Sequence, residues 1–472
     1  MDRKDIFCEI VKCECDKKFI NIKRIIMNSK EVEKDDLFVA IRGGNKFTGE
    51  ALEKGAYVVY DDKDIQIEEK FKEKAFYVND SVEFLQEFAE KWRKNLNLKV
   101  IGITGSNGKT TVKDMIYHLL SVKYKGKKTE GNYNNHIGLP FTLLRAEKGD
   151  DFIILEMGMS GFGEIDLLGK ISSPDISVIT NIGESHLEFL KTKKNVFKAK
   201  TEIIPHTKET LVINGDDEYL KDIDENSLKE KGLKTVKILN MGNDKNHMEN
   251  IKKSVKSNND FYYGDIDFNE VETKFTLEYF DENCKKWTHK FYNTNVLGEH
   301  NILNLTIAVS VAKEMALGDE EIEKAVKDIV LTNMRFQIIT KGKTTYINDA
   351  YNASPMSMKK SLETFSKIYN DREKIAVIGD MLELGEQEGE LHASIFDVII
   401  NTNLNRLYLY GPRMRFLYDR IRENSNSENI KKIETEYFES KEQIKEKLEG
   451  IKEEKVVLIK ASRGMKLEEV ME

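Results

Sequence analysis

The sequence predicts an α/β protein with three domains, the central one built on a parallel sheet that carries an antiparallel insert. Three observations lead to this prediction. Apolar runs of strand length alternate with helical patterns along most of the chain, and 472 residues exceed what a single core usually serves. In addition, aromatic and β-branched residues alternate over Phe261–Phe291, which is typical of antiparallel strands.

Residues 1–97 are predicted to form a small α/β domain. Three short apolar runs, Asp36–Arg42, Ala56–Tyr60 and Ala75–Val78, are separated by helical patterns, and an amphipathic helix is expected over Ser81–Asn95. A much stronger strand begins at Lys99, so we place the domain boundary just before it.

Residues 98–331 are predicted to form the central domain. Its strands are expected to pair mainly in parallel because helical or loop segments separate the apolar runs, which are Lys99–Thr104, Phe152–Met157, Ile176–Asn181 and Thr210–Asn214. Residues 332–472 repeat this alternation with helices of their own. They should fold as a third domain, with strands at Tyr346–Asp349, Lys374–Ile378, Arg406–Tyr410 and Val456–Lys460.

Composition restricts the kinds of partner. With 82 acidic and 74 basic residues the chain has a formal charge of -8, which gives no electrostatic footprint for nucleic acid or for an anionic membrane. No run approaches the roughly 20 apolar residues of a spanning helix, and the N-terminus lacks a signal-type apolar core, so we expect a cytoplasmic protein. The cysteines match no metal-binding spacing and are expected to be ordinary thiols: Cys8, Cys13, Cys15 and Cys284.

The segment 102–111 reads Gly-Ile-Thr-Gly-Ser-Asn-Gly-Lys-Thr-Thr and stands between an apolar strand and a helix. Such a loop turns backbone N–H groups and a helix N-terminus toward phosphate oxygens, while Lys109 neutralises charge and the Thr110 hydroxyl can hold Mg²⁺. Ile103 stands where the general G-x-x-x-x-G-K-[ST] pattern has its first glycine. The alternative is a turn that only lets a helix leave a sheet. The residues expected at a nucleoside triphosphate are Gly105, Ser106, Asn107, Gly108, Lys109, Thr110 and Thr111.

This loop resembles the phosphate loop of the superfamily of Mur ligases and folylpolyglutamate synthases. Three more segments match that superfamily in order: 131–140 resembles its substrate loop, 155–158 its metal-binding glutamate and 180–187 its second metal segment. The resemblance extends over essentially the whole chain. It implies a C-terminal domain of Rossmann-like fold.

Glu156 and His186 each follow a predicted strand, so both are expected at the carboxyl edge of a parallel sheet, where such sheets bind ligands. Together with Thr110 they can complete the coordination of Mg²⁺. The segment 197–204 resembles the superfamily stretch whose lysine is carbamylated, which assigns that role and a part in metal binding to Lys200. Lys198 is the competing assignment. Taken singly, residues of these types are more often solvated surface groups.

The resemblance assigns further roles. Asn301 is expected at the adenine, although it is equally suited to cap a helix. Arg335 matches a hinge arginine that reaches the γ-phosphate when the domains close, and Asp349 is expected at the nucleotide. The segment 349–358 resembles that of the dipeptide-adding Mur ligases, so Tyr351 and Asn352 are expected at the substrate, together with Ser29, Asn134 and Asn135. The expected catalytic residues are Lys109, His186, Lys200 and Arg335.

The function implied by the resemblance is a ligase that uses ATP and Mg²⁺ to add D-alanyl-D-alanine to UDP-N-acetylmuramoyl-tripeptide through an acyl phosphate. This step belongs to the synthesis of peptidoglycan precursors, on which cell shape and division depend. The first domain departs from the usual uridine motif, since it reads Phe-Thr-Gly-Glu at 47–50. We expect a monomer. The alternatives are a folylpolyglutamate synthase, which lacks the UDP-type domain, and a switch protein that hydrolyses ATP without either substrate.

Overall fold

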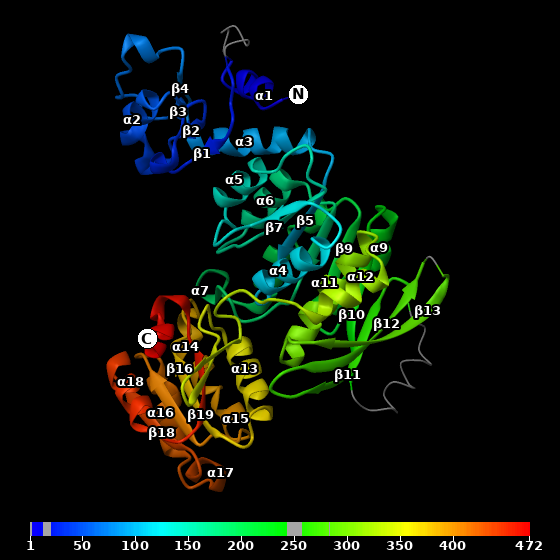
Figure 1. Ribbon diagram of the computed structural model, residues 1–472, viewed down its shortest axis with the longest axis vertical. Coiled ribbons are helices and arrows are strands. Elements are labelled where there is room, and N and C mark those ends of the chain that lie inside the picture. The colour runs from blue at the N-terminus through cyan, green and yellow to red at the C-terminus, as the bar shows by residue number, and fades with distance from the viewer. Residues whose placement is uncertain (1, 13–19, 243–256, 283) are drawn as a thin grey trace. The chain divides into compact units, whose positions relative to one another are not determined.

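The computed structural model describes residues 2–12, 20–242, 257–282 and 284–472 (Figure 1). They fall into two compact units, Met1–Ile103 with Lys123–Ser177 and Glu202–Glu209, and Thr104–Val122 with Val178–Thr201 and Thr210–Glu472. Cys8 is buried and Cys284 is exposed. The prediction for Cys13 and Cys15 lies outside the described residues.

The first unit begins with a four-stranded sheet of order β1-β2-β3-β4 in which every pair is parallel. Phe38 and Val58 lie in its core, and α1 (Arg3–Ile10) and α2 (Thr48–Glu53) accompany it. The three predicted strands are confirmed but are shorter than expected, and β1 was not predicted. The strands are β1 (Ile25–Ile26), β2 (Leu37–Val39), β3 (Tyr57–Tyr60) and β4 (Ala75–Tyr77).

The predicted amphipathic helix is present as α3 (Ser81–Lys94). Asp80 caps its N-terminus by accepting hydrogen bonds from the backbone N–H groups of Val82 and Glu83. Near its C-terminus, buried Arg93 donates from Nη2 to Asp175 Oδ2 at 2.8 Å. The same carboxylate oxygen accepts from the backbone N–H of Val100 at 2.7 Å, so this ion pair ties α3 to the strand that follows it.

The rest of the first unit alternates strands and helices, as predicted. β5 (Lys99–Thr104), β7 (Phe152–Glu156) and β6 (Gly126–Lys128) pair in parallel in that order. Every residue of β7 is buried, as expected for a parallel strand covered on both faces. The helices here are α5 (Gly138–Leu144) and α6 (Glu164–Ser172), and β8 (Ile176–Ile179) leads from this unit into the second.

The second unit contains the predicted antiparallel insert, with one difference. β9 (Thr210–Asn214), β10 (Lys234–Gly242) and β11 (Phe261–Phe268) pair in parallel, and β12 (Thr273–Asp281) and β13 (Lys286–Thr294) then continue the sheet antiparallel. The insert therefore extends a parallel sheet through its own first strand. α11 packs on α4 and on β9, β10 and β11. The helices of this region are α4 (Lys109–Leu120), α7 (Leu187–Leu190), α8 (Lys193–Thr201), α9 (Glu225–Glu230), α11 (Glu299–Glu314) and α12 (Asp319–Lys327).

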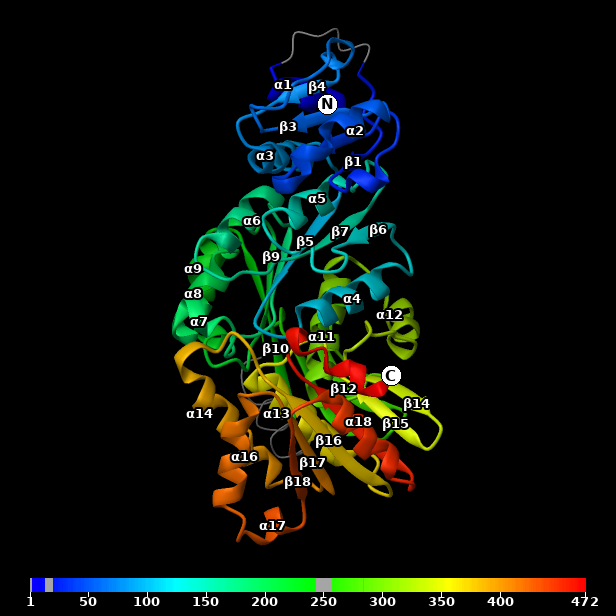
Figure 2. The same ribbon diagram turned by 90° about the vertical axis from the view of Figure 1, so that its left-hand side faces the viewer.

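The C-terminal part of the second unit holds a six-stranded sheet of order β14-β15-β19-β16-β17-β18, parallel except at the edge strand β14. Successive side chains of a strand point to opposite faces, so Ile378 joins one hydrophobic cluster and Val377 the other. Figure 2 shows α14 and α16 on one side of β16–β18 and α18 on the other. This doubly covered sheet confirms the expected Rossmann-like domain. Its elements are β14 (Gln337–Lys341), β15 (Thr344–Asn348), α13 (Pro355–Lys367), β16 (Glu373–Gly379), α14 (Glu388–Ala393), α15 (Phe396–Ile399), β17 (Arg406–Tyr410), α16 (Met414–Glu423), α17 (Glu428–Lys431), β18 (Glu434–Phe438), α18 (Lys441–Gly450) and β19 (Lys455–Lys460).

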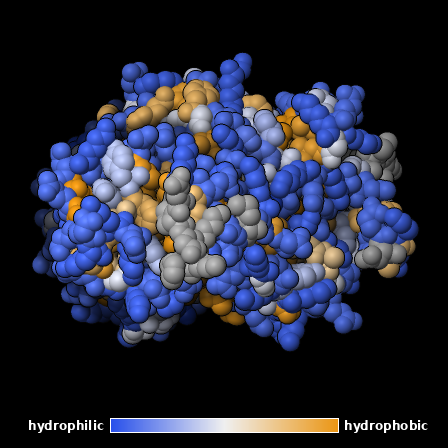
Figure 3. All heavy atoms as spheres, turned by 90° about the horizontal axis from the view of Figure 1, so that it is seen from above, coloured by the Kyte–Doolittle hydropathy of each residue, from blue (hydrophilic) through white to orange (hydrophobic). Residues whose placement is uncertain are grey.

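Hydrophilic residues dominate the face drawn in Figure 3, with apolar residues scattered between them. Within the described residues, no helix has both the length and the apolar character needed to cross a membrane.

Candidate active site

The phosphate loop, residues 105–108, follows β5 and leads into α4. Gly105 and Gly108 have φ values of +146° and +81°, which only glycine adopts without strain. The backbone N–H groups of Ser106 and Asn107 donate to the carbonyl and the side-chain oxygen of Asn181, each at 3.0 Å, and Thr180 Oγ1 donates to Asn107 O at 2.6 Å. The loop is therefore fixed against the segment that follows β8.

Lys109 and Thr110 stand in the first turn of α4, as expected for a phosphate loop. Lys109 Nζ donates to the carbonyl of Gly105 at 2.8 Å, so the ammonium lies across the loop. The backbone of Gly108 also lies close to α11, because a Cβ on Gly108 would lie 2.8 Å from Asn304 Oδ1. Thr110 and Thr111 are buried, and Ser106 and Asn107 are partly exposed.

His186 is the N-cap residue of α7 and has a left-handed φ of +56°. Its Nδ1 lies 2.9 Å from Glu383 Oε2, although the geometry is not that of a good hydrogen bond. Burial lowers the pKa of the imidazole despite the nearby carboxylate, and this favours the neutral form that can bind a metal. Glu383 comes from the loop after β16, so the C-terminal sheet supplies an acid beside a residue of the central part.

Lys200 lies on α8 and is only 1% exposed, whereas Lys198 on the same helix is exposed. Burial lowers the pKa of the Lys200 amine well below its ordinary value, and the charge of Lys109 adds to the effect. A buried lysine of this kind is favoured in its neutral, nucleophilic form.

Arg335 links the C-terminal part to the first turn of α4, directly after the phosphate loop. Its Nη2 donates to Thr110 Oγ1 at 3.1 Å, and its guanidinium stacks over the ring of Tyr351 with 4.0 Å between the carbon and the ring centre. Its Nε is buried and has no hydrogen-bond partner among the described residues. A buried guanidinium donor without a partner suits an incoming anion such as a phosphate.

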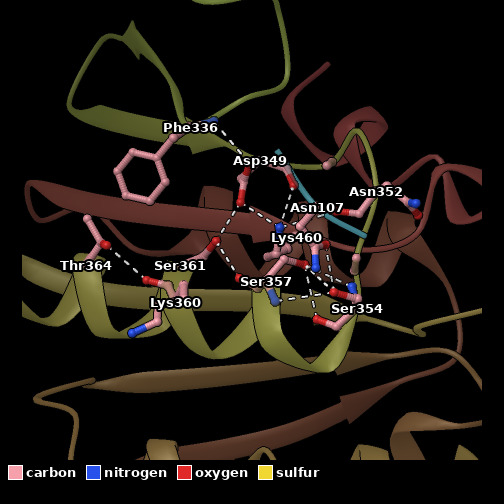
Figure 4. Close-up of polar contacts among 12 residues, drawn as sticks. Asn107, Phe336, Asp349, Asn352, Ser354, Ser357, Lys360, Ser361, Thr364 and Lys460 are labelled. Carbon is pink, nitrogen blue, oxygen red and sulfur yellow. Dashed lines mark hydrogen bonds and ion pairs between the residues drawn. The ribbon is translucent and has the colours of Figure 1, made fainter. Parts of the chain in front are cut away.

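Asp349 follows β15 and is occupied on both carboxylate oxygens (Figure 4). Oδ1 accepts from the backbone N–H of Phe336 at 3.1 Å, and Oδ2 accepts from Ser361 Oγ and Lys460 Nζ, each at 2.6 Å. Further along the same loop, Ser354 Oγ donates to Asn107 Oδ1 of the phosphate loop at 2.9 Å, whereas Asn352 is exposed.

Asn301 lies inside α11 and does not cap it. Gly298 occupies the N-cap, so the capping alternative is wrong. The side chain of Asn301 is buried, where its Nδ2 donates to Leu297 O at 2.9 Å and its Oδ1 accepts from Asn304 Nδ2 at 3.3 Å.

The remaining predicted residues belong to the first unit. Glu156 is buried at the end of β7, and Asn134 Nδ2 donates to its Oε1 at 3.1 Å. Asn135 accepts from the backbone N–H groups of Ile137 and Gly138 and so shapes the start of α5. Ser29 is buried in a short 3-10 turn, and its carbonyl accepts from Lys54 Nζ. In the described part of the chain, no three His, Cys, Asp or Glu side chains cluster as a ready-made metal site.

Comparison with known proteins shows the family to which the chain belongs. Residues 103–312 match the Mur ligase middle domain, and residues 334–463 match the Mur ligase glutamate ligase domain. A UDP-N-acetylmuramoyl-tripeptide–D-alanyl-D-alanine ligase from Bacillus subtilis is 33% identical over 95% of this chain and 92% of its own. The chain belongs to the Mur ligase family.

Two solved structures resemble this Mur ligase over nearly their full lengths. The ligase MurF from Thermotoga maritima, in complex with ADP, has a TM-score of 0.77 and 30% identity and covers 95% of this chain and 96% of its own. MurF from Acinetobacter baumannii has a TM-score of 0.82 at 24% identity, covers 99% and 97%, and shares the fold. These matches confirm the predicted family and the three-domain α/β fold class.

Ser354, Glu383 and Lys460 lie in segments of the sequence that resemble the family, 349–358, 379–385 and 460–465, but no individual role was predicted for any of the three. Each lies just after a predicted strand or at its end, where parallel sheets collect functional groups.

Proposed function

We propose that this Mur ligase joins D-alanyl-D-alanine to UDP-N-acetylmuramoyl-tripeptide and converts ATP to ADP and phosphate, a step of peptidoglycan precursor synthesis. The observation that carries the proposal is the contact of Arg335 with Thr110, because it brings a cation with a free donor to the loop that receives a triphosphate. The named activity of the full-length relative supports the choice of substrates.

The chemistry follows from the weakness of a carboxylate as an electrophile. A carboxylate oxygen of the tripeptide attacks the γ-phosphorus of ATP, and the bond to the bridging oxygen breaks, which releases ADP and leaves an acyl phosphate. The dipeptide amine then attacks the carbonyl carbon, loses a proton, and expels phosphate as the C–O bond breaks. The first step brings two anions together, and the second develops negative charge on the carbonyl oxygen and on the departing phosphate, so positive charge fixed around the phosphates lowers both barriers.

The phosphate loop is suited to that task. Its glycine conformations and the N-terminus of α4 favour phosphate binding, and the Lys109 ammonium lies across the loop, where it donates to the carbonyl of Gly105. We assign Arg335 to the γ-phosphate, which would provide the acceptor that Nε lacks. Asn301 is assigned to the adenine side of the nucleotide, and Asp349 to the nucleotide site beside Arg335, where its Oδ1 accepts from the backbone N–H of Phe336.

Thr110, Glu156, His186 and Lys200 are proposed to hold Mg²⁺, which when bound draws charge from the phosphate oxygens. Magnesium prefers oxygen ligands, and a plain ammonium would repel it. The set therefore fits the ion when Lys200 is carbamylated, because a carbamate supplies a negative oxygen at the end of a lysine. The low pKa of the buried amine supports this, since only the neutral amine reacts with CO₂.

We divide the chain into a UDP-substrate domain (1–97), a central ATP-binding domain (98–331) and a C-terminal domain that receives the dipeptide (332–472). In this division Ser29, Asn134 and Asn135 contact the UDP-linked peptide, and Tyr351 and Asn352 contact the dipeptide. The enzyme acts as a monomer in the cytoplasm, where both ATP and UDP-linked precursors are available.

Reconstitution with purified substrates tests the proposal. The enzyme is given ATP, D-alanyl-D-alanine and UDP-N-acetylmuramoyl-tripeptides that end in lysine or diaminopimelate, and phosphate and product mass are measured. We expect one phosphate per ligated product. Lys109→Ala should lower turnover at least ~10²-fold, as for other electrostatic stabilisers, whereas Lys194→Ala, an exposed lysine of α8, should not.

Two outcomes would contradict the proposal. Full phosphate release in the absence of the UDP-linked peptide would indicate a switch protein. Ligation of glutamate to a folate, with no reaction of the muramoyl peptide, would indicate a folylpolyglutamate synthase.

A further inference from the structure

Arg335 stands on a strained hinge. Its neighbours Met334 and Phe336 both have left-handed backbones, with φ values of +61° and +54°, which bulky residues seldom adopt. Such a conformation persists only where surrounding contacts enforce it. Here the backbone N–H of Phe336 donates to Asp349 Oδ1, and the backbone N–H of Tyr351 donates to Met334 O at 3.3 Å.

Both of these contacts come from the loop 349–352 after β15, which also carries the Tyr351 ring that stacks on Arg335. The direction of the Arg335 side chain is therefore set by the position of this loop. A displacement of the loop would release the hinge and the stacked ring together.

Lys460 fixes the loop. It ends β19, a strand between β15 and β16 in the C-terminal sheet, and it is only 3% exposed. Its Nζ donates to Asp349 Oδ2 at 2.6 Å, to Asn352 O at 3.3 Å and to Asp349 O at 3.5 Å. One buried ammonium thus bridges a carboxylate and two carbonyls at the two ends of the loop (Figure 4).

The same ammonium keeps Asp349 ionised and in place to accept the hydrogen bond from Phe336. Asp349 is largely buried, and a buried carboxylate that loses its counter-charge either takes up a proton or turns toward water. In both cases its hold on the Phe336 N–H weakens. Ser361 donates to the same oxygen as Lys460 but brings no charge, so it cannot replace the lysine.

We propose that Lys460 is a positioning residue for Arg335, acting through Asp349 and the loop 349–352. The inference rests on the proposed role of Arg335 at the γ-phosphate. Lys460 itself makes no contact with the phosphate loop among the hydrogen bonds of the described residues; its effect passes through the hinge.

Nucleotide affinity measures this effect without catalysis. The ratio of the dissociation constants of ADP and a non-hydrolysable ATP analogue reports the contribution of the γ-phosphate. It is measured by calorimetry for wild type, Arg335→Ala, Lys460→Met and the double variant. We expect Arg335→Ala to reduce the preference for the analogue about 10- to 10²-fold, the value of a charge-assisted hydrogen bond.

Lys460→Met should reduce the same preference by at least about 10-fold and leave ADP affinity unchanged, since ADP lacks the phosphate that Arg335 contacts. In the Arg335→Ala background it should have no further effect, because residues that act through one group are not additive. Turnover of Lys460→Met should fall about 10²-fold, as when a catalytic group is misplaced by a small distance.

Lys374→Met is the matched control. Lys374 is a buried lysine of the neighbouring strand β16, but among the described residues its Nζ donates to neutral oxygens, those of Ser366, Asn370 and Asn403. This variant should lose stability without changing the analogue preference. If Lys460→Met does not fold, Ser361→Ala removes one donor to Asp349 Oδ2 and should reduce the preference to a smaller degree.

The outcomes separate the inference from its premise. If Arg335→Ala keeps the full preference, the proposed role of Arg335 is wrong. If Arg335→Ala loses it but Lys460→Met keeps it, or if the two losses add, Lys460 does not act through Arg335 and the inference is overturned.

Discussion

Gly105→Ala should close the phosphate loop to nucleotide while leaving the fold intact. A Cβ at this position would lie 1.9 Å from Thr180 Oγ1 and 3.1 Å from both the Cβ and the backbone nitrogen of Thr180. No real Cβ tolerates the first of these distances, so either the loop or the threonine has to move. Because Thr180 Oγ1 donates to Asn107 O at 2.6 Å, each movement breaks a bond that holds the loop in shape.

These contacts give the free-energy cost of the Gly105→Ala substitution. A buried hydrogen bond whose partner is left unsatisfied costs about 1–3 kcal/mol, and an extra methyl group in a packed site costs about 1–3 kcal/mol. An alanine at a φ of +146° is strained by a further ~1–3 kcal/mol. These costs are not additive, so we take a total of about 3 kcal/mol or more. Because ATP binding requires the undistorted loop, this cost is taken from the binding free energy, and affinity for ATP should fall at least ~10²-fold.

Calorimetric titration with a non-hydrolysable ATP analogue checks this expectation. Gly149→Ala is the control, because a Cβ on Gly149 meets no heavy atom within 4 Å. The double variant Gly105→Ala/Thr180→Ala should bind better than Gly105→Ala alone, since the closest clash is removed. Wild-type affinity in Gly105→Ala, or no relief in the double variant, would refute the steric argument.

Two further predictions concern buried lysines. Lys200→Ala should lower turnover at least ~10²-fold, and added formate or acetate should partly restore turnover by replacing the carbamate. Lys198 is exposed, so Lys198→Ala should keep its turnover and should not respond to formate or acetate. Unchanged turnover in Lys200→Ala would contradict the carbamate. Burial lowers the pKa of Lys374 from 10.5 to about 8. Between these two pH values the unfolded chain therefore binds more protons than the folded one. The free energy of unfolding should rise with pH across this window by about 3 kcal/mol. Denaturant unfolding from pH 7 to 11 should show this rise in wild type and not in Lys374→Met; an equal rise in both would assign it to other groups.

Much of the fold could be predicted because a parallel strand covered on both faces is a continuous apolar run. β5, β9 and β17 begin and end at the predicted residues, and β19 begins one residue earlier than predicted. The less buried strands β6, β14 and β18 were not predicted, since half-exposed residues leave no such run. β10 was missed as well, although four of its nine residues are buried, because lysines and polar residues interrupt its apolar positions.

The sequence by itself determined the local chemistry of this protein. Glycines at 105 and 108 dictate backbone angles that other residues resist, and the lysine and threonines after them dictate an anion site, so the phosphate loop follows from neighbours in the chain. Only the tertiary structure decided which distant groups meet. Arg335 and Thr110 are separated by 225 residues, and Lys460 and Asp349 by 111. Lys460 meets Asp349 because strands β15 and β19 align in register, and Arg335 meets Thr110 because the chain turns at residues 334–336. Both arrangements depend on packing energies summed over many side chains rather than on any motif.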